Sequence, residues 1–95
     1  MASTIDDISI EYTEGGVTTT KQLDKVVLTK GAWTTIMFKY QDWDNKAQDY
    51  GPIKYCIRRY QKRNNEYKTK SKFNISNKDQ AIKIVDILNN WIAQD

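Results

Sequence analysis

Histidine is absent from this 95-residue chain, and cysteine and proline each occur once. Without histidine, the chain lacks the usual general base at neutral pH and the commonest metal ligand. The single cysteine, Cys56, cannot form an internal disulfide, and no candidate base is evident beside it. We therefore expect no enzyme activity, no bound metal, no cofactor and no small-molecule substrate.

Long apolar runs are also missing. No stretch approaches the roughly 18 apolar residues of a membrane span. The acidic amino end, MASTIDDISI, lacks the basic start and the apolar stretch of a secretory signal. Together with the lack of disulfides, this predicts a cytoplasmic protein that does not bind a membrane.

Glycine is scarce, and Gly31 and Gly51 are isolated, so no phosphate-binding loop is present. The acidic residues between Asp42 and Asp49 are spaced somewhat like those of a calcium loop. However, residues 46–47 place a lysine and an alanine where such a loop needs an oxygen ligand and a glycine. We expect no calcium site.

The charged residues are distributed unevenly. Residues 53–73, IKYCIRRYQKRNNEYKTKSKF, hold eight of the fifteen basic residues of the chain and one of its twelve acidic residues. The rest of the chain holds the other seven basic and eleven acidic residues. The net charge of +3 therefore hides a segment near +7 and a remainder near −4. Such a concentration needs a structural reason, a partner, or both.

Alternating apolar and polar residues predict four antiparallel strands. We expect them at residues 23–29, 33–43, 53–63 and 67–75, with Gly31 in the first hairpin turn because glycine adopts positive φ without steric cost. A fifth short strand within residues 5–12 is an alternative. Otherwise residues 1–20 are treated as an acidic extension of one domain that spans residues 21–95.

The last hairpin turns at residues 64–65, but its register is open. A two-residue loop would place Ile57 opposite Lys72, whereas a three-residue loop keeps Ile57 in the apolar row of Phe73. A slip of one residue turns every side chain of a strand to the other face. We therefore predict a three-residue loop, formed with either neighbour of the two asparagines.

Ser76 or Asn77 is expected to cap a helix that runs from about Asn77 to Ile92. Its apolar stripe has a spacing of three and four residues and consists of Ala81, Ile84, Val85, Leu88 and Ile92. The element order gives an α+β fold, ββββα, with the stripe packed on one face of a four-stranded sheet. Ile87 and Trp91 flank the stripe, and we expect them at the interface of a homodimer because they would otherwise stay exposed.

The apolar rows of the strands define the face that we expect the helix to cover: Ile36, Phe38, Tyr40, Ile53, Tyr55, Ile57, Phe73 and Ile75. The opposite face is then basic, with aromatic residues among the cations. Its candidate nucleic-acid-binding residues are Trp33, Lys39, Trp43, Lys54, Arg58, Tyr60, Lys62, Lys68, Lys70 and Lys72. On this face Arg58 would meet Lys70 or Lys72, and such like-charge pairs destabilise an antiparallel sheet. A polyanion laid across the sheet would offset their repulsion.

The aromatic residues narrow the class of partner. Phosphates require only cations, and a protein that bound duplex backbone could manage with lysines. Exposed tryptophan and tyrosine rings offer flat platforms for unstacked bases, at about 1–3 kcal/mol per base. Bases are available for stacking in single strands and loops. The combination favours single-stranded DNA or RNA, and acidic residues 1–20 could compete with it as a tethered mimic.

The strand-to-helix junction FNISNKDQ, residues 73–80, and the order of four strands and a helix resemble the positive-cofactor-four transcriptional coactivator family. The plan is also similar to the purine-rich-element-binding repeats. Over residues 21–93 the resemblance implies a curved sheet, dimerised partly through its helices, that holds single-stranded nucleic acid, with a role in transcription or nucleic-acid maintenance. It implies a general role as strand ligands for Arg58, Tyr60, Lys62, Lys68, Lys70 and Lys72. The first twenty residues have no counterpart.

A protein-interaction module is the alternative function. The basic face could meet an acidic protein surface, and Ile82, Ile87 and Trp91 could dock a partner. Lysines on an edge strand also guard against edge-to-edge aggregation. Binding to single-stranded and duplex oligonucleotides separates this alternative from nucleic-acid binding.

Overall fold

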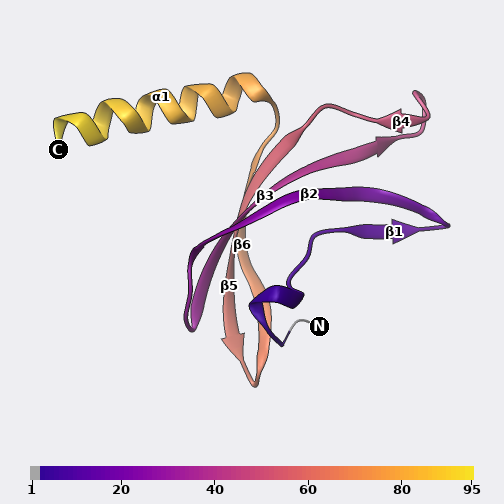
Figure 1. Ribbon diagram of the computed structural model, residues 1–95, viewed down its shortest axis with the longest axis horizontal. Helices are drawn as coiled ribbons and strands as arrows, with labels where there is room; N and C mark the ends of the chain where they lie inside the picture. Colours follow the sequence, from indigo (N-terminus) through magenta and orange to yellow (C-terminus); the bar gives the residue numbers. More distant parts are fainter. Residues whose placement is uncertain (1–2) are drawn as a thin grey trace.

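The protein has an α+β fold in a computed structural model that describes residues 3–95. A curled antiparallel sheet is followed by one C-terminal helix (Figure 1). The elements are η1 (Ile5–Asp7), β1 (Tyr12–Glu14), β2 (Val17–Thr29), β3 (Trp33–Asp44), β4 (Asp49–Tyr50), β5 (Lys54–Arg63), β6 (Glu66–Ile75) and α1 (Lys78–Gln94). The strand order is β1-β2-β3-β5-β6, and the short β4 pairs with β3. The predicted fold class is confirmed, although β2 is longer than predicted and β1 and β4 are additional strands.

Two hairpins turn through pairs of residues with positive φ. Gly15 and Gly16 connect β1 to β2 with φ of 59° and 81°, and Asn64 and Asn65 connect β5 to β6 with φ of 51° and 63°. Two-residue turns of this kind match the twist of the flanking strands, and asparagine tolerates the left-handed region better than most residues. The three-residue loop that we predicted between β5 and β6 is therefore wrong.

The register of β5 and β6 nevertheless pairs Ile57 with Phe73, as predicted. The ladder shifts at Lys70, which has no partner across it and forms a β-bulge. One extra residue in one strand restores the apolar pairing beyond the two-residue turn. The bulge therefore produces the pairing of Ile57 with Phe73 that we had expected from a three-residue loop.

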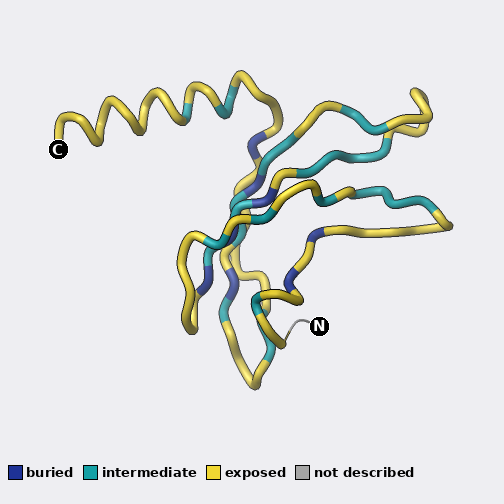
Figure 2. Tube along the Cα trace, viewed as in Figure 1, coloured by how far each residue is buried: buried dark blue, intermediate teal, exposed yellow. Residues whose placement is uncertain are grey.

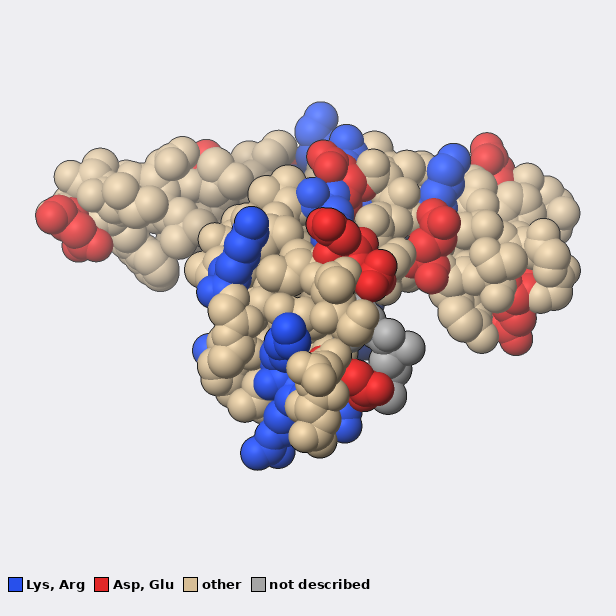
Figure 3. Space-filling model, turned by 60° about the horizontal axis from the view of Figure 1, so that its bottom comes forward, with Lys and Arg blue, Asp and Glu red and all other residues tan. Residues whose placement is uncertain are grey.

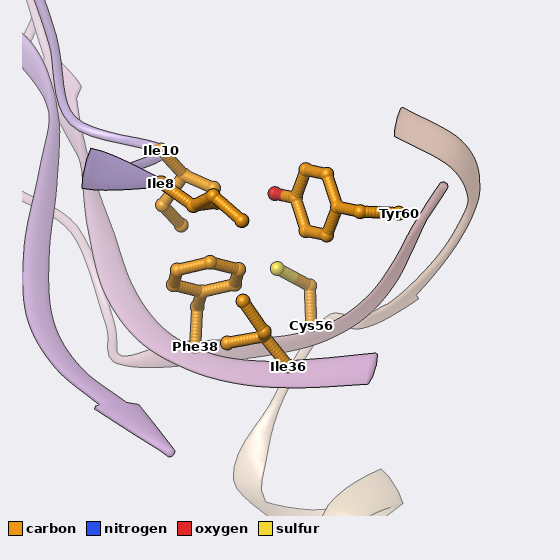
Figure 4. Close-up of a cluster of buried hydrophobic side chains, with 6 residues drawn as sticks. All are labelled: Ile8, Ile10, Ile36, Phe38, Cys56 and Tyr60. Atoms are coloured by element: carbon orange, nitrogen blue, oxygen red, sulfur yellow. The ribbon is translucent and has the colours of Figure 1, made fainter. Parts of the chain in front are cut away.

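The core lies on one face of the sheet, which we call the inner face and which carries Ile36 and Cys56. Its buried apolar cluster consists of Ile8, Ile10, Ile36, Phe38, Cys56 and Tyr60. Figure 4 shows Ile8 and Ile10 closing over the side chains of β3 and β5 from the opposite side. These two isoleucines belong to residues 1–20, so the boundary that we placed at residue 20 does not separate this segment from the core.

Two side chains of β2 hold the N-terminal segment on the inner face. The Lys25 ammonium donates hydrogen bonds to the backbone carbonyls of Ile5 and Ile8, the latter at 2.8 Å. The side-chain oxygen of Gln22 accepts a hydrogen bond from the backbone N–H of Ile10 at 3.0 Å. The bonds to the Ile8 carbonyl and the Ile10 N–H satisfy backbone groups of buried residues, and together these contacts fix the segment where its isoleucines reach the core.

Helix α1 begins as predicted, with the Asn77 side chain accepting a hydrogen bond from the backbone N–H of Gln80 at 2.8 Å. The helix then runs away from the sheet and contacts chiefly β6 near its own start (Figure 1). The prediction that it packs on the face of Ile57 and Phe73 is wrong for the single chain. Only two residues link β6 to α1, and the N-terminal segment closes the core instead. No helix within residues 3–95 is long and apolar enough to cross a membrane.

The single chain has an open shape. Its radius of gyration is 15.4 Å, whereas a compact domain of this length has about 12–13 Å. Its accessible surface is 6971 Å², whereas a compact monomer of this mass has about 5,600 Å². Much of the excess lies on α1, whose backbone Figure 2 shows as exposed along nearly all of its length. The fold as a single chain therefore leaves apolar surface without a partner.

Candidate nucleic-acid interface

The ten candidate residues do not share one face of the sheet. In the ladder between β3 and β5, Phe38 pairs with Cys56, and Met37 pairs with Ile57. Even-numbered positions of both strands therefore share the inner face, and odd-numbered positions share the outer face. We had matched even positions of β3 with odd positions of β5, which is wrong. The small Cys56, rather than Ile57, fills the space beneath the N-terminal segment.

Register and alternation distribute the candidates over both faces. The inner-face positions are Lys54, Arg58, Tyr60, Lys62 and Lys72, the outer-face positions are Trp33, Lys39, Trp43 and Lys68, and the bulge holds Lys70. Most of them still belong to the β5–β6 hairpin, which forms the lower end of the molecule in Figure 1. Figure 3 shows basic side chains gathered on that lower part, with a few acidic ones beside them, while most of the visible side of α1 is uncharged apart from acidic side chains, chiefly at its far end.

Three candidates already have structural partners. Tyr60 is 5% exposed and belongs to the core, so it is not the exposed platform that we predicted. The Lys54 ammonium lies 3.1 Å from a carboxylate oxygen of Asp42. The ring of Trp43 packs edge-on against Tyr50 with 5.2 Å between centroids. These contacts are made within the sheet, and neither buried Tyr60 nor partly buried Trp43 presents a fully exposed ring to a base.

The outer face carries the best-formed exposed platform. Trp33, at the start of β3, is 41% exposed, and the guanidinium of Arg59 lies over its ring at 4.5 Å from the centroid. A cation held over an aromatic face stabilises the position of both groups. We missed Arg59 because we assigned its row of β5 to the covered apolar face. The sequence feature that could have identified Arg59 is its position within the basic segment of residues 53–73.

The tip of the β5–β6 hairpin repeats this combination of a cation and an aromatic ring. The Lys62 ammonium lies over the ring of Tyr67 at 5.5 Å from the centroid. Tyr67 is half-buried against the core cluster, so one side of the ring is supported. Sequence reasoning missed Tyr67 as well, although it stands between two lysine-rich stretches.

Among residues 3–95, every cation of the β5–β6 hairpin except Lys54 lacks an ion-pair partner. Arg58 lies opposite Lys72 across the ladder, as one of our two alternatives predicted. Within residues 3–95, the only ion pair joins Lys54, at the start of β5, to Asp42 on β3, and it does not involve Arg58 or Lys72. The repulsion between Arg58 and Lys72 is therefore not offset by a neighbouring carboxylate.

The hydroxyls of buried Tyr60 and partly buried Tyr40 stay neutral near these cations. Burial raises the pKa of the Tyr60 hydroxyl above its usual value, and the nearby Arg58 guanidinium partly offsets this increase. Burial also raises the pKa of the Tyr40 hydroxyl. Both side chains are therefore uncharged at neutral pH, and they contribute no negative charge to the inner face.

The described residues show no arrangement for holding a metal: within residues 3–95, no group of three or more histidine, cysteine, aspartate or glutamate side chains is placed to bind one.

In comparisons with protein-family models, curated proteins and solved structures, nothing matches this chain. The interpretation of the site therefore depends on its residues and their geometry.

Proposed function

We propose that this protein binds single-stranded DNA or RNA through the β5–β6 hairpin and the adjoining outer face. The observation that carries the proposal is the concentration of cations on this hairpin, of which only Lys54 has an ion-pair partner within residues 3–95, with the exposed Trp33 and the half-buried Tyr67 beside them. Repulsion such as that between Arg58 and Lys72 costs the fold stability. A polyanion removes that cost by placing negative charge between the cations.

The phosphates of the bound nucleic acid would lie along β6. This β-strand lies at the edge of the sheet and exposes Lys68, Lys70 and Lys72 along its length. Each lysine contacts phosphate as a point charge and carries no sequence information. The binding is therefore proposed to be tolerant of sequence and strongly weakened by salt.

The bases would stack on exposed rings, chiefly Trp33 with its supporting Arg59. A ring stacks on any base, but only if the base is not paired and stacked within a duplex. This requirement is the reason for proposing single strands rather than duplex DNA. We retain the cytoplasm as the location and nucleic-acid transactions, including transcription, as the process.

A second copy of the chain is the proposed protein partner. Val85, Leu88, Trp91 and Ile92 of α1 are all 47–69% exposed, and the described chain exposes about 1,300 Å² more surface than a compact monomer would. A standard interface buries about 800 Å² on each partner. The excess surface of the chain is therefore sufficient for such an interface, and we place the homodimer interface on the apolar face of α1, which includes Ile87 and Trp91. An acidic protein partner for the hairpin remains the alternative.

Fluorescence anisotropy with a labelled oligo-dT strand, an oligo-U strand and a duplex of the same length tests the proposed function. We expect both single strands to bind more tightly than the duplex, and all affinities to fall as salt rises. No binding of either single strand at low salt would contradict the proposal. Binding of an acidic protein surface without nucleic-acid binding would favour the alternative.

A further inference from the structure

An open cleft of about 590 Å³ lies between the N-terminal segment and the β5–β6 hairpin. Residues 7–9 line one side, and Arg58, Tyr60 and residues 67–69 line the other. The cleft exists because Ile8 is anchored in the core while the hairpin continues beyond it. The nucleic-acid contacts proposed above lie on the edge strand β6 and on the outer face, so this cleft is separate from them.

Arg58 brings an unmet requirement to this cleft. Its Nε is buried and has no hydrogen-bond partner among residues 3–95, and Arg58 lies opposite Lys72 across the ladder. A buried donor without an acceptor is unfavourable, and a guanidinium carries several donors in a fixed plane. A tetrahedral anion with several oxygens satisfies such a group better than a single water does, because guanidinium and phosphate match in geometry.

The walls of the cleft suit a phosphate that is attached to a nucleotide. Tyr67 lines both this cleft and a neighbouring hollow, whereas Lys62, which lies over its ring, lines only the neighbouring hollow. Part of Tyr67 therefore faces the cleft, where a sugar or base could lie against it. The Thr69 hydroxyl is a further polar group on the same wall.

We infer that this cleft takes one phosphate group of the bound strand, with Arg58 as its ligand and Tyr67 as the surface for the attached nucleotide. The inference rests on the proposed function and names a subsite within it. Asp7 lines the opposite wall and brings one negative charge. Its carboxylate repels a phosphate, so the N-terminal segment lowers the affinity of the cleft for this group.

Arg58→Lys tests the inference, with Arg63→Lys as the matched control. Both changes keep the charge and remove the planar fork, but Arg63 lies at the end of β5 and outside the cleft. We expect Arg58→Lys to weaken binding of an oligo-dT strand about tenfold, because the bidentate contact is lost. Arg63→Lys should change it less than about twofold. Asp7→Asn should tighten binding, most at low salt.

Nuclear magnetic resonance on the wild-type protein supplies a readout that does not depend on a variant folding. Thymidine monophosphate should shift the Nε–H signal of Arg58 and the amide signals of Ser9 and Thr69, and thymidine should not. If Arg58→Lys binds the strand as tightly as the wild type, the subsite is wrong and strand binding stands. If inorganic phosphate shifts these signals while the strand does not, the cleft is a free-anion site, which also overturns the inference. If the wild type binds no strand at all, the proposed function fails together with the subsite.

Discussion

Arg58 on β5 faces Lys72 on β6, and neither forms an ion pair with a carboxylate in the described part of the chain that could offset their repulsion. Two like charges directly opposite each other oppose the pairing of the strands that carry them. The stability of the free protein and its affinity for a polyanion are therefore coupled through this pair. A change that relieves the repulsion should stabilise the free protein and weaken binding.

Lys72→Glu tests this coupling. We expect the free energy of unfolding to rise by about 0.2–1 kcal/mol, because an opposite-charge pair replaces a like-charge pair. Affinity for oligo-dT should fall at the same time. Urea unfolding and anisotropy measure the two quantities, and Lys83→Glu on α1 is the control for a change of charge alone. A variant that is destabilised, or that binds more tightly, would contradict the coupling.

Ile8→Ala should destabilise the protein by about 2–4 kcal/mol, because it removes methyl groups from a packed core and leaves a cavity. Ile8 is 4% exposed, whereas Tyr12 in β1 is 56% exposed. Tyr12→Ala is therefore the control and should cost much less. Urea unfolding measures both. Equal and small effects would show that the N-terminal segment contributes little to the core.

The position of Ile8 also changes how the acidic N-terminal residues should be tested. Removal of residues 1–20 would expose Phe38 and Cys56 and delete the start of β2, so it would act on folding before it acted on binding. Single charge substitutions, such as the one at Asp7, leave the isoleucines in place. They are the sharper test of competition with nucleic acid.

Much of the fold could be predicted from local sequence pattern. Alternation in β3, β5 and β6 identified the strands, and the cap at Asn77 identified the start of α1. These signals are local because each depends on the neighbours of a residue along the chain. The pairing of Ile57 with Phe73 was also accessible, since it joins two apolar rows.

The faces of the sheet could not be predicted in the same way. Whether Cys56 or Ile57 points to the core depends on what covers the sheet, and the cover is the distant segment that contains Ile8 and Ile10. Hydrophobicity alone favours isoleucine over cysteine. The register between β3 and β5 decides the matter, and no residue of either strand signals it. Because we assigned the two faces of β5 wrongly, we left Arg59 out of the candidate site and included Tyr60 in it.

Leu88→Asp should convert the proposed homodimer into a monomer. Light scattering is expected to give twice the 11.1 kDa of the chain for the wild type and one chain mass for the variant. A helix of this length is marginal in water without a partner, so the variant should also lose helical circular dichroism. Asn90→Asp is the control, since Asn90 lies on the opposite side of α1. A wild-type protein that scatters as a single chain at micromolar concentration is inconsistent with the dimer.

Alkaline pH should destabilise the fold through Tyr60. Burial raises the pKa of its hydroxyl in the folded state, so the unfolded chain releases this proton at lower pH. Stability is therefore retained below the ordinary tyrosine pKa of about 10 and falls as pH rises from there towards the folded-state value. Tyrosinate absorbance should show late titration of both Tyr40 and Tyr60, and Tyr60→Phe should reduce its amplitude whereas Tyr12→Phe should not. Co-titration of every tyrosine at the ordinary pKa would contradict the shift.

Trp33→Ala and Lys70→Ala should separate stacking from charge. Trp33 is exposed and supported by Arg59, so its loss is expected to cost about 1–3 kcal/mol of binding free energy with little change in the salt slope. Lys70 stands at the bulge of the edge strand, so its loss should weaken all sequences alike and lower the salt slope by about one unit. Anisotropy titrations over a range of salt concentrations measure both effects.

Trp43→Ala is the informative comparison, because the Trp43 ring packs on Tyr50 and its indole N–H donates to Asn45 at 2.9 Å. It should lower stability more than affinity, and a larger loss of affinity than Trp33→Ala would place the stacked base at the other end of β3.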